Sequence, residues 1–375
     1  MTTAADPKLA HNATLSGLRG AAALVVFGYH CVAIDPSVSL ELGGVRLNSW
    51  LGMGWLGVYV FFGLSACLLT QSYLQSGVSR LALGRYLLRR IARCFPAFWV
   101  QLILISLAIL VLGYRALPTG WDYWSQYLMN FGAWPYRADQ LVGVWWTLPV
   151  EFGFYMLLPL LLPWLRSRWL PALVLLSFAV TVGFRYASVH WLSEGSEPRI
   201  VLMSGQLPGL LDVFVAGCLV PLLIERTRSI PANLSLLLGV AGVYLCSQLL
   251  LMNLAQYWSG HWSYLLFPTL VGYSIGLALV GVLRGASIAR ALFGHRVGSF
   301  YGDISYGLYL WHMPVLGGLM ALSWFRTDEG KWLAWPLVLS ALFVSTLLAW
   351  LSWRLIERPC IVWAKSKRSS RRAVC

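Results

Sequence analysis

Charged side chains are scarce in this chain of 375 residues, and acidic ones most of all. Only 11% of the residues are Asp, Glu, Lys or Arg, whereas a soluble domain carries about 25%. Hydrophobic residues make up 58% of the chain, more than a soluble fold can hide from water. The 20 tryptophans and 17 tyrosines suit the aromatic belts of a bilayer. These proportions exclude an ordinary soluble protein and predict an all-α, polytopic transmembrane helical bundle.

Several other features are missing. The seven cysteines show no disulfide or metal spacing, so we expect packing roles and no metal site. No segment resembles a nucleic-acid module despite the net charge of +14, and we expect no nucleic-acid partner. No internal repeat is evident, which argues mildly against the transporter class, because transporters often contain such symmetry.

The hydrophobic pattern predicts about ten membrane spans, each long enough for a hydrocarbon core of about 30 Å. They are residues 15–34, 53–73, 94–113, 141–165, 171–187, 200–224, 234–252, 262–282, 298–320 and 335–353. We expect residues 1–356 to form the transmembrane domain and residues 357–375 to form a basic cytoplasmic tail.

The basic residues set the orientation of these spans. Lys and Arg concentrate in alternate connections, while the intervening connections are close to neutral. The basic segments are 74–93, 166–168, 225–228, 284–296 and the tail from residue 354. Basic residues in short loops stay on the cytoplasmic side. Both termini are therefore expected in the cytoplasm, with the protein a multi-pass component of the inner (cytoplasmic) membrane.

The first span carries an arginine and a histidine on one face. Arg19 and His30 are eleven residues apart, about three helical turns and ~16 Å along the axis. Ionisable groups at membrane depth are costly and usually face the bundle interior. Because arginine binds anions and histidine transfers protons near neutral pH, the pair indicates a site.

Two further arginines lie at the inner end of the third span. Arg90 and Arg93 are neighbours on a helix and together suit a phosphate group. From spacing alone, a topology anchor that touches lipid phosphates is the favoured interpretation. Pro96 suits the beginning of the third span, since proline is tolerated in a first helical turn.

The fourth span contains Glu151, which must be protonated or paired at that depth. Glu151 could orient a histidine, act as an acid or base, or bind a substrate hydroxyl. The alternative is a structural hydrogen bond between helices. Ser65, in the second span, lacks a nucleophile elbow, and we expect it to pack. Arg185 is expected to reach the outer interface by snorkelling, and Asp212 is expected to be structural.

The ninth span carries Ser305-Tyr306-Gly-Leu-Tyr309-Leu-Trp311-His312. A face with aromatic rings and a histidine could line a sugar or acyl pocket. The more common role of a lone histidine in a helix is packing, and that alternative stays open.

Taken together, these segments resemble the integral-membrane acyltransferase 3 family over nearly the whole chain. Four family elements match in order: Arg-x10-His at Arg19–His30, Arg-x-x-Arg at Arg90–Arg93, Trp…Glu…Phe-Tyr at Trp145–Tyr155, and Ser-Tyr-x-x-Tyr-x-x-His at Ser305–His312. There are two departures. Ala66 follows Ser65 where glycine is usual, and Phe152 follows Glu151 where a second acid is common.

The resemblance implies a membrane O-acyltransferase. It would move an acetyl or other short acyl group from cytoplasmic acyl-CoA to a hydroxyl of a cell-envelope polysaccharide or lipid-linked sugar, as in exopolysaccharide O-acetylation. Acetyl-CoA would be a co-substrate, with no tightly bound cofactor.

On this hypothesis His30 and Glu151 are catalytic, with His30 the general base. Arg19, Arg90 and Arg93 hold the acyl donor. The acceptor pocket is formed by His312, Trp311, Tyr309 and Ser305. The alternatives are a transporter that uses intramembrane His, Glu and Arg as a substrate or proton relay, and a scaffold of an envelope-synthesis complex.

Overall fold

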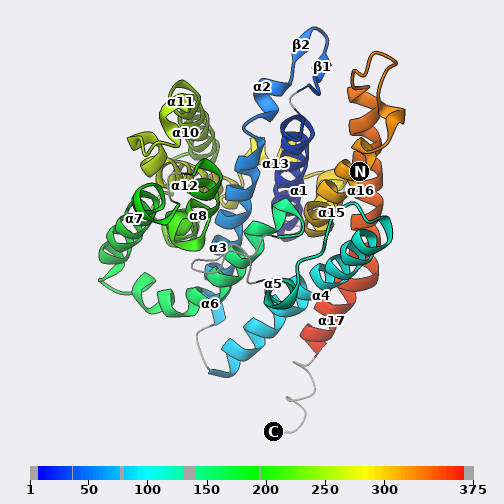
Figure 1. The fold of residues 1–375 in the computed structure, drawn as a ribbon. Coiled ribbons are helices and arrows are strands. Elements are labelled where there is room, and N and C mark those ends of the chain that lie inside the picture. Colours follow the sequence, from blue (N-terminus) through cyan, green and yellow to red (C-terminus); the bar gives the residue numbers. More distant parts are fainter. Residues whose placement is uncertain (1–6, 36, 77–79, 130–139, 194–195, 367–375) are drawn as a thin grey trace, which may run out of the picture.

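The computed structural model describes residues 7–35, 37–76, 80–129, 140–193 and 196–366 and is almost entirely helical (Figure 1). The longer helices are α1 (Pro7–Ala33), α3 (Gly57–Ser76), α4 (Arg80–Leu112), α6 (Thr147–Leu165), α7 (Leu170–Ala187), α9 (Leu211–Leu223), α10 (Ala232–Met252), α12 (Trp262–Leu283), α15 (Ser305–Met320) and α16 (Ala334–Ser352). The short elements are β1 (Glu41–Leu42), β2 (Val45–Arg46), α2 (Asn48–Leu51), η1 (Gly54–Leu56), α5 (Gly120–Tyr127), η2 (Gly143–Trp146), η3 (Ser188–Leu192), α8 (Glu197–Ser204), η4 (Leu207–Leu210), α11 (Leu254–Tyr257), α13 (Ser287–Phe293), α14 (Arg296–Asp303), η5 (Ser323–Phe325), η6 (Trp353–Glu357) and α17 (Arg358–Ser366). The all-α prediction is confirmed; β1 and β2 form one small antiparallel hairpin.

Eight helical stretches in the described ranges are long and apolar enough to cross a membrane. The other two expected spans, the sixth and the ninth, are broken. The sixth is divided into α8, η4 and α9, because Gln206 is extended (ψ 163°) and Pro208 begins a new turn. The ninth changes direction at Ile304, between α14 and α15. Broken helices at membrane depth usually line a cavity.

The third span begins earlier than the sequence pattern predicted. Helix α4 starts at Arg80 and runs for 33 residues with Pro96 in its interior, so the expectation that Pro96 opens the helix was wrong. At 1.5 Å per residue α4 is about 50 Å long, more than the ~30 Å hydrocarbon core. The Leu, Arg and Ala residues before the proline are good helix formers, so the helix extends beyond the apolar segment.

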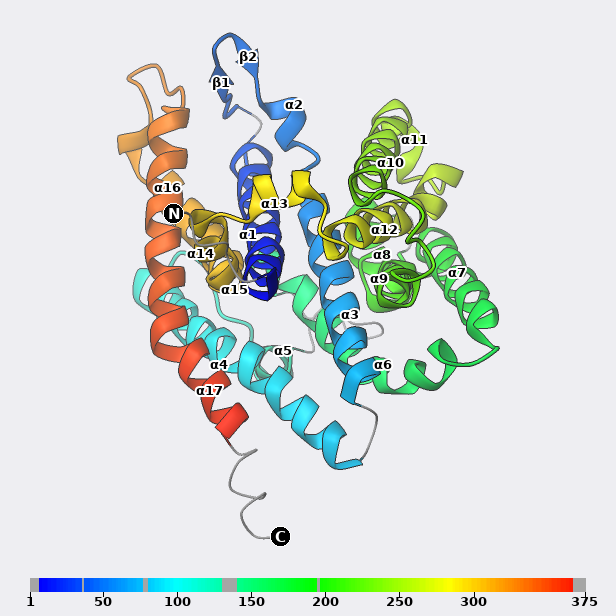
Figure 2. The ribbon, with the colours of Figure 1, turned by 180° about the vertical axis from the view of Figure 1, so that it is seen from behind.

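Helix α1 lies at the centre of the bundle, between α14–α16 on one side and α3 on the other (Figure 2). Small residues allow this close packing. A Cβ atom at Gly20 would lie 2.7 Å from the carbonyl oxygen of Gly298, and one at Gly302 would collide with the carbonyl of Ser16. The backbones of α1 and α14 are therefore in direct contact, which holds the Arg19 segment in the bundle interior.

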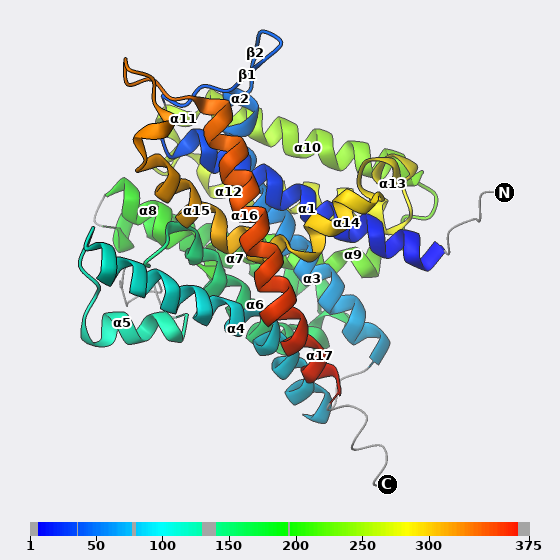
Figure 3. The same ribbon diagram turned by 90° about the vertical axis from the view of Figure 1, so that its right-hand side faces the viewer.

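Different elements lie at the two ends of the bundle. Helix α13 and the first turns of α1 lie toward one end, and α5 and α11 lie toward the other (Figure 3). This arrangement agrees with the charge pattern, which put the segment of α13 in the cytoplasm. The boundary expected between residues 356 and 357 stays a prediction; the helical backbone runs across it from α16 through η6 into α17.

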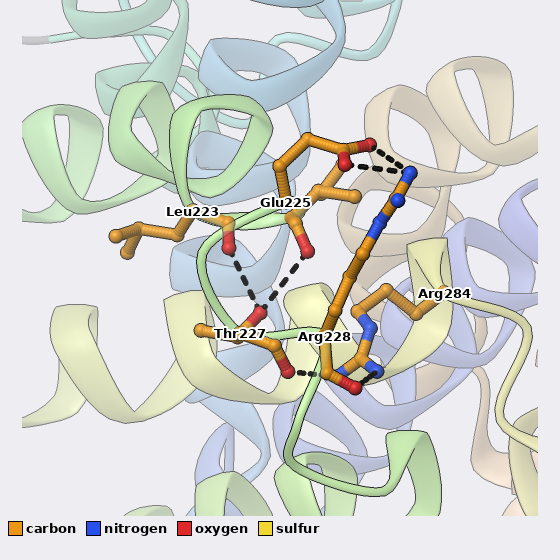
Figure 4. Close-up of polar contacts among 6 residues, drawn as sticks. Leu223, Glu225, Thr227, Arg228 and Arg284 are labelled. Atoms are coloured by element: carbon orange, nitrogen blue, oxygen red, sulfur yellow. Dashed lines mark hydrogen bonds and ion pairs between the residues drawn. The ribbon is translucent and has the colours of Figure 1, made fainter.

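One basic residue of a segment expected in the cytoplasm binds backbone carbonyls of a neighbouring connection. The Arg284 guanidinium donates to the backbone carbonyls of Thr227 (2.7 Å) and Arg228 (3.0 Å) (Figure 4). It also donates to the backbone carbonyl of Ile230 (2.5 Å). These carbonyls belong to the turns after α9, and that of Thr227 also accepts from the backbone N–H of Ile230 (3.0 Å). Arg284 therefore ties the connection between α9 and α10 to the end of α12.

On the opposite side, Asp35 connects the segment after α1 to the segment before α16. Its carboxylate accepts hydrogen bonds from the Ser37 hydroxyl (2.6 Å) and backbone N–H (2.9 Å), and from Trp332 Nε1 (2.8 Å). These donors, led by the Ser37 hydroxyl, lower the pKa of Asp35 below its ordinary value.

Candidate active site

A cavity of about 50 Å³, room for several water molecules, lies inside the bundle. Helices α1, α3, α4 and α15 surround it, together with the first turns of α6. Its polar lining residues are Arg19, Ser65, Arg93, Thr147, Glu151, Ser305, Tyr306 and Tyr309. The break between α14 and α15 puts the first turns of α15 against this space, so the interruption of the ninth span helps to form the cavity.

Two arginine side chains face the cavity from different helices. Arg19 comes from α1 and Arg93 from α4, and the two charges are close enough to repel each other. Within the described ranges, neither guanidinium has a hydrogen-bond or ion-pair partner within 4.0 Å. A guanidinium at membrane depth needs water or an anion to satisfy its donors. The cavity therefore suits an anionic group.

Glu151 supplies the opposite charge. Its Oε1 accepts a hydrogen bond from the Ser65 hydroxyl (2.8 Å) and a short one from the Tyr155 hydroxyl. Of the roles left open for Glu151, its hydrogen bond to Ser65 matches the structural one, because it joins α6 to α3. The expectation that Ser65 merely packs was wrong, because Ser65 lines the cavity and donates to the carboxylate.

Arg90 and Arg93 are neighbours on α4 but have different surroundings. Arg93 lines the cavity, whereas the Arg90 guanidinium lies 5.9 Å from the ring centre of Tyr86 and 5.7 Å from that of Tyr155. The Nε atom of Arg90 is buried without a hydrogen-bond partner in the described chain. Arg90 is thus near the cavity without lining it.

His30 lies beside His312, a pairing that the sequence did not predict. The ring centres are 4.9 Å apart, and His312 Nε2 is 3.2 Å from His30 Nδ1. His312 is 1% exposed and His30 is partly buried. The His312 ring centre is 5.8 Å from that of Tyr309, which lines the cavity. The histidine pair is therefore next to the cavity.

The four residues assigned to an acceptor pocket do not form one group. Ser305 and Tyr309 line the cavity together with the arginines. Tyr309 is also anchored, because its hydroxyl donates to the Val144 carbonyl (2.7 Å) and accepts from Thr147 (2.8 Å). Trp311 packs against the apolar core and does not line the cavity. All assigned site roles remain predictions.

Two buried polar residues near the site were not predicted from the sequence. Gln101 is fully buried, accepts from Trp145 Nε1 (2.9 Å) and donates to the Leu310 carbonyl (2.5 Å). Glu357 is 2% exposed, accepts from Ser352 (2.9 Å) and attracts Arg93 electrostatically. Gln101 is a polar residue in an apolar span, a signal that was available. Glu357 follows its span in a basic tail, so only packing reveals its burial.

Two other ionisable residues are buried away from the cavity. Arg185 is 3% exposed, so the snorkelling prediction was wrong. It donates to the Tyr264 carbonyl (2.8 Å), and its guanidinium lies 4.0 Å from the centre of that ring. Asp212 accepts from Ser177 (2.6 Å) and Thr269 (2.5 Å), which joins α9 to α7 and α12. These contacts give both residues structural partners.

Fold and site together define a polytopic membrane protein with a charged internal cavity and an adjacent histidine pair, an arrangement suited to group transfer within a helical bundle. A family model described as an acyltransferase domain matches residues 12–354. The chain belongs to this acyltransferase family, and the resemblance stated from its motifs is confirmed. The protein is a multi-pass membrane O-acyltransferase.

Three curated relatives illustrate the family. Nodulation protein 10 of Rhizobium leguminosarum bv. viciae is 27% identical, covering 86% of this chain and 87% of that protein. Peptidoglycan O-acetyltransferase OatA of Listeria monocytogenes is 25% identical, covering 92% of this chain and 55% of that protein. O-acetyltransferase OatA of Staphylococcus aureus is 23% identical, covering 92% of this chain and 56% of that protein. The chain thus spans about half the length of the two OatA proteins. No solved structure matches the chain.

Proposed function

We propose that the protein transfers an acetyl or other short acyl group from cytoplasmic acyl-CoA to a hydroxyl of a cell-envelope glycan or lipid-linked sugar. Its place would be the inner (cytoplasmic) membrane. The relatives named for O-acetyl transfer, one of them for peptidoglycan, support a glycan acceptor.

Acyl-CoA is proposed as the donor because two arginines of the cavity, Arg19 and Arg93, have no hydrogen-bond or ion-pair partner in the described chain. Coenzyme A is polyanionic, and guanidinium groups bind phosphate through two parallel hydrogen bonds. Arg90 adds positive charge beside the same space. The thin pantetheine arm would then extend past Tyr309 toward the histidine pair.

His30 would act as the general base of the transfer. In the direct form of the reaction, the acceptor oxygen attacks the thioester carbonyl carbon while its proton passes to His30. The carbon–sulfur bond breaks, and the departing thiolate takes a proton from the imidazolium. One hydroxyl and one acyl-CoA become one ester and one thiol. General base catalysis of this kind contributes about 10²–10⁴-fold.

A labelled-donor experiment tests the proposal. Purified protein in proteoliposomes is supplied with acetyl-labelled acetyl-CoA and, in separate reactions, soluble peptidoglycan fragments or a lipid-linked sugar. We expect label in the glycan, with a mass gain of one acetyl group. His30→Ala should lower the rate by about 10²–10⁴-fold, while His190→Ala, which changes an exposed histidine of η3, should not.

Three results would contradict the proposal. A near-normal rate for His30→Ala at matched expression would refute the role of His30 as general base. If the label stayed on acetyl-CoA with every acceptor tested, acetyl-CoA would be refuted as the acyl donor. Substrate flux across the membrane without acyl transfer would support the transporter alternative.

A further inference from the structure

His30 and His312 contact each other and also backbone carbonyls of their own helices. His30 Nδ1 lies 2.9 Å from the carbonyl oxygen of Val26 and 3.2 Å from His312 Nε2. His312 Nδ1 lies 3.1 Å from the carbonyl oxygen of Leu308. Each imidazole therefore has one nitrogen against a backbone carbonyl of its own helix, and the two helices, α1 and α15, meet through the remaining contact.

One assignment of the ring protons satisfies all three contacts. A carbonyl oxygen only accepts hydrogen bonds, so the Nδ1 atoms of His30 and His312 both carry hydrogen. Neutral His312 then has an unprotonated Nε2, which shares the single Nδ1–H of His30 with the Val26 carbonyl. A neutral His30 with hydrogen on Nδ1 has its lone pair on Nε2, and this atom has no hydrogen-bond partner in the part of the chain that the structure describes.

The surroundings favour a neutral His312. Its side chain is 1% exposed and is packed by the rings of Phe27 (6.4 Å), His30 (4.9 Å) and Tyr309 (5.8 Å). Among the described residues, no carboxylate lies within 4.0 Å of its ring nitrogens to stabilise an imidazolium. A positive charge there would also repel a protonated His30.

We propose that His312 is a positioning residue that acts through His30. As a neutral acceptor it keeps the His30 proton on Nδ1, orients the ring, and leaves Nε2 as the nitrogen that takes the substrate proton. During transfer the hydroxyl proton moves to His30 Nε2 and later to the departing thiolate, while His312 gains and loses no proton. This inference rests on the proposed role of His30 as general base.

The proton position is measurable without turnover. Nitrogen-15 NMR of histidine-labelled protein in lipid bilayers distinguishes protonated from unprotonated ring nitrogens. His30→Asn identifies the signal of His30 among the six histidines. We expect hydrogen on Nδ1 of His30 in the unchanged protein and a substantial Nε2-protonated fraction in His312→Leu. Hydrogen on Nε2 of His30 in the unchanged protein would overturn the inference, whether or not the protein transfers acyl groups.

Kinetics separate positioning from mere packing. His312→Leu should lower kcat by about 10²-fold with little change in KM for acetyl-CoA, because the arginine cavity is untouched. His312→Gln retains an acceptor near the Nε2 position and should recover about tenfold of that loss. His190→Gln serves as the control. Equal loss in the Leu and Gln variants, both folded, would refute the positioning role, whereas full activity of His30→Ala would refute the proposed base itself.

Discussion

Replacement of Arg93 by alanine should weaken acetyl-CoA binding without destabilising the protein. Arg93 lines the cavity and has no hydrogen-bond partner in the described chain, so its removal leaves no other protein group unsatisfied. It also relieves repulsion from Arg19, which offsets the lost attraction between Arg93 and Glu357. The measured loss should therefore report the ligand contact and not a folding defect.

The magnitude follows from the kind of contact. A hydrogen bond to a charged group contributes about 1.5–3 kcal/mol, and about 1.4 kcal/mol corresponds to a tenfold change in Kd. Arg93→Ala should raise the Kd of acetyl-CoA by about 10–100-fold. Arg93→Lys keeps the charge but lacks the planar fork, and its loss should be intermediate.

Equilibrium binding of labelled acetyl-CoA to protein in nanodiscs is the assay. Arg226→Ala is the matched control, because Arg226 is exposed in the connection between α9 and α10, carries the same charge and is also expected on the cytoplasmic side. A difference between acetyl-CoA and its dephosphorylated analogue should shrink in the Arg93 variant. An unchanged Kd, or an equal loss in Arg226→Ala, would refute the phosphate role.

Three structural predictions follow. Gly302→Ala puts a Cβ atom into the backbone of α1 and should lower the free energy of unfolding by about 1–3 kcal/mol. In Gly317→Ala the new Cβ atom meets no atom within 4 Å, and this control should be tolerated. Thermal unfolding in detergent compares the two variants, and equal stability would contradict the packing of α1 on α14. Gln101→Leu removes two buried interhelical hydrogen bonds and should cost about 1–3 kcal/mol in the same assay, with no change contradicting the role of that contact. Because the folded pKa of Asp35 is lowered, its stabilisation is complete above the ordinary value of 3.8 and is lost as pH falls through the folded pKa. The protection of the segment after α1 against hydrogen exchange, expressed as the ratio of the intrinsic to the observed rate, should fall over that range and should be independent of pH there in Asp35→Asn.

The sequence predicted most of the membrane architecture. Hydrophobic length identified all ten segments that the structure contains as continuous or interrupted helices, since about 20 apolar residues are needed to cross a bilayer. It failed at Pro96 and at the break before α15, because hydropathy records apolarity and not backbone direction. Interruptions depend on which neighbouring groups accept the freed backbone hydrogen bonds.

Most residues of the candidate site were predicted from the sequence, but which of them lie together was not. Arg19, Arg93 and Glu151 were all expected, since ionisable groups in apolar spans are informative by themselves. Ser65 and Gln101 were not recognised, because a lone polar residue in an apolar helix has the same appearance whether it packs or holds a functional group. The partner across the helix interface decides between these possibilities.

Composition by itself determined that this chain is a polytopic membrane protein, and loop charge predicts its orientation, because both effects act through the solvent and need no particular contact. The motifs by themselves also determined its family. Only the tertiary structure decided that Arg19 and Arg93 share a cavity and that His30 meets His312, residues 282 positions apart. Such pairs depend on packing of whole helices against one another, which local sequence does not encode.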